Sequence, residues 1–264
     1  MNLRLNGKTA LVSGSTAGIG YAVAPGLARE GARVFVNGRT QARVDTALAT
    51  IRQEVPNAVV EGIAEDLGTA TGCDRLVARL PSVDILVNNL GIFEPKPFAE
   101  IPDADWLRLF EVNVMSGVRL SRAYLPGMKR RDWGRIVFIS SESAVQIPAE
   151  MVHYGMTKTA QIAVARGIAE GCAGTGVTVN SILAGPTASE GVTTFVAQLA
   201  KQQHMTPEDF EKEFFKSVRP SSLLQRFLEP AEVAKVVVFV CSPEAVAING
   251  AAVRAEGGVV KAIV

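Results

Sequence analysis

The sequence has 264 residues, of which 48% are hydrophobic and 20% charged, and its 27 Lys and Arg residues nearly balance its 26 Asp and Glu residues. This balance excludes a disordered chain, which would combine low hydrophobicity with high net charge, and argues against a nucleic-acid partner, which usually requires a basic excess. An α/β fold of this length can form one unit with a large buried core. We therefore expect a single globular domain over residues 1–264.

Cysteine and histidine residues are few and far apart. Cys73, Cys172 and Cys241 form no CxxC pair, and neither His153 nor His204 has a partner at metal-ligand spacing. A disulfide framework and a metal site are therefore not expected.

The sequence also carries no signal for export or for a membrane. Its first residues lack the continuous apolar segment of a signal peptide. The longest apolar run near the C-terminus, 236–241, is far shorter than the roughly 20 residues that span a bilayer. We expect a cytoplasmic protein without membrane contact.

Short apolar runs rich in β-branched residues alternate with segments of helical length along most of the chain. Residues 8–13 form the first run, and apolar residues at helical spacing follow from 19 to 29, which predicts a strand, a tight turn and a helix. Further strands are predicted at 33–37, 58–63, 83–88, 135–140, 177–183 and near 250–255. The alternation predicts an α/β, Rossmann-type doubly wound sheet of about seven mostly parallel strands, with helices on both faces.

The segment from Thr187 to about Leu228 departs from this alternation, because it is much longer than a usual connection of about 2 to 6 residues. We expect it to contain short helices and to lie beside the carboxyl edge of the sheet, where long insertions commonly act as lids. A segment that only packs against the domain is the alternative. Another helix is predicted from Pro230 to Phe239.

Three glycines lie between the first predicted strand and the first predicted helix, in the pattern GxxxGxG. Glycine lets the backbone turn sharply and approach a ligand, and the amide groups at a helix N-terminus favour an anion. The turn therefore predicts a site for the pyrophosphate of a dinucleotide, with a plain tight turn as the alternative. The residues expected to bind it are Gly14, Ser15, Thr16, Gly18, Ile19 and Gly20.

The end of the second predicted strand indicates which dinucleotide is bound. An acidic residue there would bind the ribose hydroxyls of NAD, whereas an arginine accommodates the 2′-phosphate of NADP. The sequence has Arg39 and Thr40 at this point and no carboxylate. We expect NADP(H) to be preferred over NAD(H); the alternative is that Arg39 only caps a solvated turn.

Three residues form a candidate site for proton transfer. Tyr154 and Lys158 are four residues apart, so on a helix both side chains lie on one face. A nearby ammonium group favours the phenolate, so we expect the pKa of Tyr154 to lie below its usual value of about 10. Ser141 follows a predicted strand, at the edge where a parallel sheet binds ligands, and could hold a substrate carbonyl. Taken separately, Tyr154 and Lys158 could be an ordinary pair on a helix surface, and Ser141 could be a turn residue. The prediction depends on all three occurring together.

In order and spacing, these motifs resemble those of the short-chain dehydrogenase/reductase family over essentially the whole chain. The glycine turn is similar to the family's TGxxxGxG, with Ser13 in place of threonine, and 88–91 resembles its NNAG, with Leu90 in place of alanine. Asn113 and the segment 180–187, which has Ala184 where proline is usual, extend the resemblance.

The resemblance implies a catalytic set of Asn113, Ser141, Tyr154 and Lys158. Tyr154 would exchange the proton while the coenzyme carries the hydride, and Ser141 would steady the developing oxyanion. Lys158 would bind the nicotinamide ribose and shift Tyr154, while Asn113 would hold a water that connects Lys158 to solvent. Further coenzyme contacts are implied for Asp66, Leu67, Asn89, Gly91, Gly185, Thr187 and Ser189. A homotetramer is implied as well, because most similar proteins are tetramers.

The substrate is expected to be a small carbonyl compound or a secondary alcohol. Glu142 and Glu150 could contact a polar substrate, but we expect them to be solvated loop carboxylates. Residues expected to face the substrate are Phe93, Glu142, Ser143 and Met151.

Two other functions are considered. One is a 3-oxoacyl-carrier-protein reductase, which is disfavoured because Thr175 stands where such relatives often have arginine. The other is a non-catalytic dinucleotide-binding sensor or scaffold, against which the intact Ser141, Tyr154 and Lys158 argue.

Overall fold

The computed structural model describes residues 2–202 and 205–263, in which seven strands form one parallel sheet of order β3-β2-β1-β4-β5-β6-β7. The strands are β1 (Thr9–Val12), β2 (Arg33–Gly38), β3 (Val60–Ala64), β4 (Ile85–Asn88), β5 (Gly134–Ser141), β6 (Val177–Ala184) and β7 (Ala252–Ala255). Each strand end lies within two residues of its prediction. The predicted doubly wound sheet is therefore confirmed.

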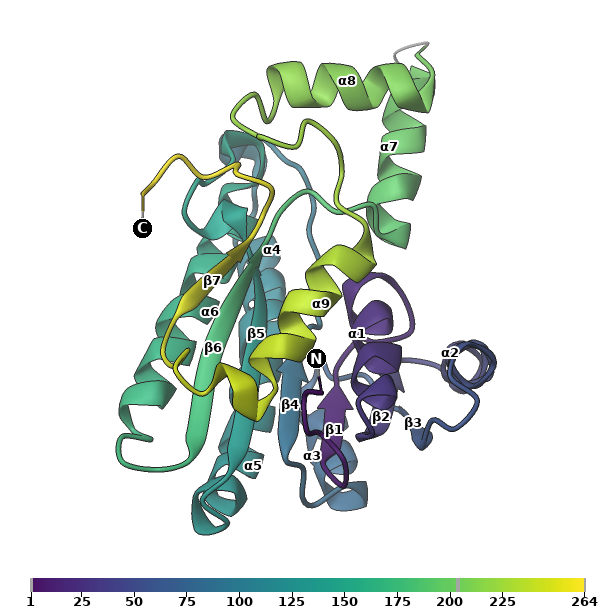
Figure 1. The fold of residues 1–264 in the computed structure, drawn as a ribbon. Helices are drawn as coiled ribbons and strands as arrows, with labels where there is room; N and C mark the ends of the chain where they lie inside the picture. The colour runs from purple at the N-terminus through teal and green to yellow at the C-terminus, as the bar shows by residue number, and fades with distance from the viewer. Residues whose placement is uncertain (1, 203–204, 264) are drawn as a thin grey trace.

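Helices cover both faces of this sheet (Figure 1). One face packs against α1 (Gly18–Arg29), α2 (Gln41–Glu54) and α9 (Pro230–Val240), and the other against α3 (Ala70–Arg79), α5 (Ser116–Arg130) and α6 (Val152–Glu170). Successive residues of a strand enter opposite cores: Ala10 and Val12 join the first, and Leu11 the second. This explains why the central strands are largely apolar on both faces. Within the described residues, no helix combines the length and the apolar character that crossing a membrane requires.

The position of β1 determines where a ligand can bind. β1 pairs with β2 on one side and with β4 on the other, so the order of the strands reverses there. At such a reversal the connections leave the sheet in opposite directions and open a crevice at the carboxyl ends of the strands. Residues that follow β1 and β4 are thereby brought to one place.

The segment after β6 rises above this edge of the sheet as α7 (Glu190–Gln202) and α8 (Pro207–Ser217) (Figure 1). The expectation of short helices between 187 and 228 is confirmed. A backbone bridge between Thr187 and Leu228 joins its two ends. The rings of Phe214, Phe215 and Phe227 pack with centroids 5.1 to 5.2 Å apart and attach α8 to the chain that leads into α9. His204, one of the two histidines, lies outside the described residues.

Candidate active site

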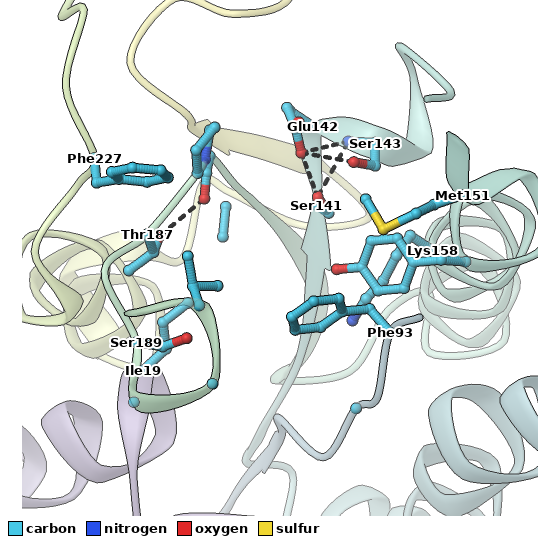
Figure 2. A pocket seen from close by; sticks show the side chains of 18 of the residues that line it. Ile19, Phe93, Ser141, Glu142, Ser143, Met151, Lys158, Thr187, Ser189 and Phe227 are labelled. Carbon is cyan, nitrogen blue, oxygen red and sulfur yellow. Dashed lines mark hydrogen bonds between the residues drawn. The ribbon is translucent and has the colours of Figure 1, made fainter. Parts of the chain in front are cut away.

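A cavity of about 990 Å³ lies between the glycine turn, the carboxyl ends of β4, β5 and β6, and the helices α7 and α8. Figure 2 shows Ser141, Lys158, Met151 and Phe93 on one wall, and Thr187, Ser189, Ile19 and Phe227 on the facing wall. Of the predicted coenzyme residues, the cavity is lined by Gly14, Gly18, Ile19, Asn89, Gly91, Tyr154, Lys158, Gly185, Thr187 and Ser189. The predicted substrate-facing residues Phe93, Glu142, Ser143 and Met151 line it as well. Outside its lining lie Ser15, Thr16, Gly20, Arg39, Thr40, Asp66, Leu67 and Asn113.

The glycine turn has the geometry of an anion site. Gly14 and Gly18 adopt φ angles of +58° and +59°, which residues with a Cβ rarely adopt. A Cβ at Gly18 would approach the Cβ of Ser189 to 3.1 Å, so the space between turn and facing wall depends on glycine. Among the described residues, no side chain caps the amide groups at the start of α1. These amides, at the positive end of the helix dipole, fit the pyrophosphate of a dinucleotide.

Some predicted coenzyme residues support this turn. The Asn89 amide donates to the backbone oxygens of Ser13 and Gly14 over 3.0 and 2.9 Å. The Ser15 hydroxyl, fully buried, donates to the Val12 carbonyl over 2.7 Å. Gly20 lies against Asn89, where a Cβ would come within 2.3 Å of its amide nitrogen. The side chains of Ser15 and Asn89 therefore hold the backbone in shape.

Basic residues follow β2 beside the turn. Arg39 is exposed and, in the described part of the chain, has no hydrogen-bond or ion-pair partner. Its guanidinium is therefore free to donate hydrogen bonds to a phosphate. The Thr40 hydroxyl caps α2 by accepting a hydrogen bond from the Arg43 amide at 3.5 Å. Arg43 forms a 2.7 Å ion pair with Glu190 of α7. Sequence reasoning missed this link between α2 and the segment above the cavity.

The remaining predicted coenzyme residues next to β2 and β3 have local structural roles. Thr16 packs at the end of β2, where a Cβ on Gly38 would lie 2.5 Å from its methyl group. The Asp66 carboxylate accepts a hydrogen bond from the Gly68 amide at 3.0 Å, and Leu67 is buried in the core. These three residues do not line the cavity, so they could contact only a part of a dinucleotide that extends beyond it.

The facing wall begins where β6 ends. Gly185 passes so close to the backbone of Glu256 that a Cβ would lie 2.6 Å from the Glu256 oxygen. The Thr187 hydroxyl donates to the Gly185 carbonyl over 2.8 Å, and the Ser189 amide donates to the Thr187 carbonyl over 2.7 Å. This compact turn places the residues predicted to lie near the nicotinamide across the cavity from Ser141.

The residues predicted for proton transfer come together at the floor of the cavity. Ser141 ends β5, and Tyr154 and Lys158 lie one turn apart in α6. The buried Lys158 ammonium donates to the Ile139 carbonyl at 2.9 Å and lies 5.5 Å from the centroid of the Tyr154 ring. All three side chains therefore face one space that a substrate carbonyl could enter.

Asn113 lies behind this group, in a π-helical turn over Glu111–Met115. Its side chain donates to Thr157 at 3.0 Å, and its backbone oxygen accepts a 2.6 Å hydrogen bond from Gln161. The same Gln161 side chain accepts a 3.3 Å hydrogen bond from Lys158. A buried glutamine thus connects Lys158 to Asn113. The spacing of Gln161, seven residues after Tyr154, could have placed it on this helix face.

The expectation of a solvated carboxylate is wrong for Glu142, of which only 3% is exposed. Its Oε1 accepts a 2.8 Å hydrogen bond from Nε of Arg219, which lies in the connection after α8 and is also buried. Its Oε2 accepts hydrogen bonds from the Ser141 hydroxyl and from the Ser143 amide. The partner lies 77 residues away, so no local pattern could reveal it. For Glu150 the expectation is confirmed, since 48% of its side chain is exposed.

Comparison with known proteins agrees with this geometry. The profile of the family described as short chain dehydrogenase matches residues 8–200. This protein belongs to that family. It is 49% identical to an uncharacterized oxidoreductase of Bacillus subtilis, YvaG, over the whole of both chains. It is 34% identical to a D-beta-hydroxybutyrate dehydrogenase of Cupriavidus necator, covering 96% of this chain and 98% of that one.

Among solved structures, this short-chain dehydrogenase resembles the L-sorbose reductase of Gluconobacter frateurii, which was crystallised with NADPH and L-sorbose. The TM-score is 0.94 over the whole of both chains, at 30% sequence identity. The family and the relatives together establish the protein as an oxidoreductase of the short-chain dehydrogenase family.

Burial controls the acid–base properties of the site in this short-chain dehydrogenase. It raises the pKa of Tyr154 above the ordinary value, the charge of Glu142 raises it further, and the hydrogen bond with Ser141 opposes both. Burial also lowers the pKa of Lys158 to about 8. The expected lowering of the Tyr154 pKa by Lys158 is therefore not found. The ammonium group is directed at the Ile139 carbonyl and Gln161, and loss of water around the phenol dominates.

Proposed function

We propose that this protein reduces a carbonyl compound with NADPH, or oxidises the corresponding secondary alcohol with NADP⁺, with Tyr154 as the acid–base group. One observation carries the proposal: Ser141, Tyr154 and Lys158 line the same cavity as the glycines of the anion-binding turn. A coenzyme bound by that turn and a carbonyl held at Ser141 would therefore share one cavity.

The coenzyme would be held from three sides. The glycine turn would bind its pyrophosphate, the exposed Arg39 its 2′-phosphate, and Thr187 with Ser189 the carboxamide of its nicotinamide. The NADPH in the L-sorbose reductase structure supports the preference for NADP(H) over NAD(H). When bound, NADPH would supply the hydride.

The raised pKa of Tyr154 suits reduction, because the phenol keeps the proton that it must donate. As the phenol releases that proton to the substrate oxygen, the nearby Lys158 ammonium would stabilise the phenolate that forms. Ser141 would hold the substrate oxygen beside Tyr154 by turning its hydroxyl hydrogen from Glu142 to that oxygen. Asn113 and Gln161 touch neither reactant and would act by holding Lys158 in place.

The segment from 187 to 228 would close the cavity as a lid, because α7 and α8 contribute to the wall opposite Ser141. Assembly as a homotetramer is proposed from the resemblance to the family. A cytoplasmic location is proposed because Cys73, Cys172 and Cys241 are buried and unpaired, which fits a reducing compartment.

The test is NADPH oxidation with a panel of ketones, aldehydes and 3-oxoacyl thioesters, compared between wild type and Tyr154→Phe. We expect turnover that the substitution lowers by at least about 100-fold while NADPH still binds. Tyr21→Phe is the matched control, since that hydroxyl donates to Glu54 on the surface and does not line the cavity. Turnover that survives Tyr154→Phe would contradict the acid–base role. Tight NADPH binding without turnover of any compound would favour the sensor or scaffold.

A further inference from the structure

The ion pair between Glu142 and Arg219 lies at the substrate end of the cavity, next to the serine that is proposed to hold the carbonyl. Both residues line the cavity, and only 4% and 9% of their side chains are exposed. Removing two charges from water is costly, so a buried ion pair adds little stability compared with an apolar pair in the same place, although loss of one partner alone is destabilising. The pair does fix the positions of both side chains. A substrate at this end of the cavity can contact only those atoms of the pair that the protein leaves free.

Both carboxylate oxygens of Glu142 are already hydrogen-bonded within the protein. Its Oε1 accepts from Arg219, and its Oε2 accepts from the Ser143 amide at 2.6 Å, the Ser143 hydroxyl at 3.0 Å and the Ser141 hydroxyl. The carboxylate thus connects the guanidinium of Arg219 to the serine at the reaction centre. Its effect is to hold these two groups at a fixed separation.

Arg219, by contrast, keeps donors for a ligand. Its Nε donates to Glu142, and its Nη1 donates to the Val218 carbonyl at 3.0 Å and lies 3.6 Å from Glu150. In the part of the chain that the structure describes, Nη2 has no hydrogen-bond partner. Because the guanidinium is planar and held on two sides, its free N–H groups have a defined direction. Such a donor can recognise an oxygen atom on a substrate.

The charges around the Glu142–Arg219 ion pair indicate which kind of substrate oxygen Arg219 can bind. Glu142, Glu150, Glu190 and Glu213 line the same cavity as Arg219, and the cations in this lining are Arg219 and Lys158. A substrate carboxylate would meet an excess of negative charge there, whereas a neutral hydroxyl oxygen would not.

We propose that Arg219 is a specificity residue, positioned by Glu142, that donates a hydrogen bond to a hydroxyl oxygen on the carbon next to the reacting carbonyl. The preferred substrate class is then a neutral α-hydroxy ketone. This inference rests on the proposed function, because it assumes that the carbonyl binds at Ser141 and Tyr154.

The test uses three ketones that share one aryl group, which suits a cavity lined by Phe93, Phe214 and Phe227. They are 2-hydroxyacetophenone, acetophenone and the anion phenylglyoxylate, each reduced with NADPH. For wild type we expect kcat/KM to be about 10- to 100-fold higher for the hydroxy ketone than for either of the others. In Arg219→Met, the ratio of hydroxy ketone to acetophenone should fall to about 1 to 3, because only the hydroxy ketone loses a contact.

Three further variants make the result specific. The double variant Glu142→Gln/Arg219→Met removes both charges and should also abolish the preference for the hydroxy ketone over acetophenone. It provides the test where Arg219→Met alone folds poorly. Arg219→Lys keeps a cation but loses the planar group, so the preference should fall in part. Arg226→Met is the matched control: this arginine lies in the same connection but pairs with Glu232 outside the cavity, and its loss should leave the ratio unchanged.

The outcomes separate the inference from the proposed function. A general structural role for Arg219 would slow all ketones together and leave their ratio unchanged, which would overturn the inference. A wild type that reduces acetophenone as well as its hydroxy derivative, or that prefers phenylglyoxylate, would overturn it too. If wild type reduced no carbonyl compound of any kind, the proposed function itself would fail.

Discussion

Replacing Gly20 by alanine should damage the anion-binding turn, and the structure gives the size of the effect. An added Cβ would lie 2.3 Å from the Asn89 amide nitrogen and 2.8 Å from the Gly14 backbone oxygen. Asn89 cannot withdraw without losing its hydrogen bonds to the oxygens of Ser13 and Gly14. Two lost hydrogen bonds at about 1 kcal/mol each, with about 1 to 3 kcal/mol for overpacking, lower the free energy of unfolding by about 3 to 5 kcal/mol.

Urea unfolding and a fluorescence titration with NADPH would measure the two consequences. We expect Gly20→Ala to unfold at lower urea concentration and to bind NADPH at least about 10-fold more weakly, since the turn that holds the pyrophosphate is displaced. Gly167→Ala is the matched control, because this exposed glycine of α6 has no atom within 4 Å of an added Cβ. It should raise the free energy of unfolding by about 0.5 to 1 kcal/mol. Wild-type stability and NADPH affinity in Gly20→Ala would refute the reasoning.

Other consequences of the site can be measured separately. Arg39→Ala should raise the dissociation constant of NADPH by about 10- to 100-fold and change that of NADH by less than about 3-fold; equal changes in a fluorescence titration would exclude a phosphate contact. Reduction needs the charged form of Lys158, so kcat should fall as pH rises above about 8, the pKa of that ammonium. Gln161→Leu removes a hydrogen bond to the charged form and should move this fall in the pH–rate profile to lower pH; an unmoved profile would contradict the positioning role. Arg219→Met leaves Glu142 buried without its cation and should lower the free energy of unfolding by about 3 to 5 kcal/mol. In urea unfolding, Glu142→Gln/Arg219→Met should lose less than the sum of its single variants, and strict additivity would show that the residues are not coupled.

The sheet and the reacting residues were predictable because their signals are local. A strand buried on both faces is apolar at most positions, as in β1, where Ala10 and Leu11 enter opposite cores. Ser141 could be placed because it directly follows the predicted strand 135–140, and in the structure it is the last residue of β5. Tyr154 and Lys158 could be placed because helical periodicity puts residues four apart on one face.

The environment of these residues was not predictable in the same way. Glu142 was expected in solvent because nothing near it in the sequence signals Arg219, which reaches it only through the fold of the segment after α8. The direction of the Tyr154 pKa depends on how completely the phenol is buried, and spacing alone does not contain that information. Gln161 lies one helical turn after Lys158 on the same face of α6, so helical spacing is sufficient to predict its position.

The most direct test of the central claim is the fate of deuterium from NADPH labelled at both C4 positions of the nicotinamide. Incubated with a reducible ketone, the wild-type enzyme should place one deuterium on the carbinol carbon of the product. Tyr154→Phe should bind the labelled coenzyme but leave almost all of the deuterium on it, because the proton donor is missing. Alcohol formed without deuterium, or labelled alcohol formed by Tyr154→Phe at the wild-type rate, would contradict hydride transfer assisted by Tyr154.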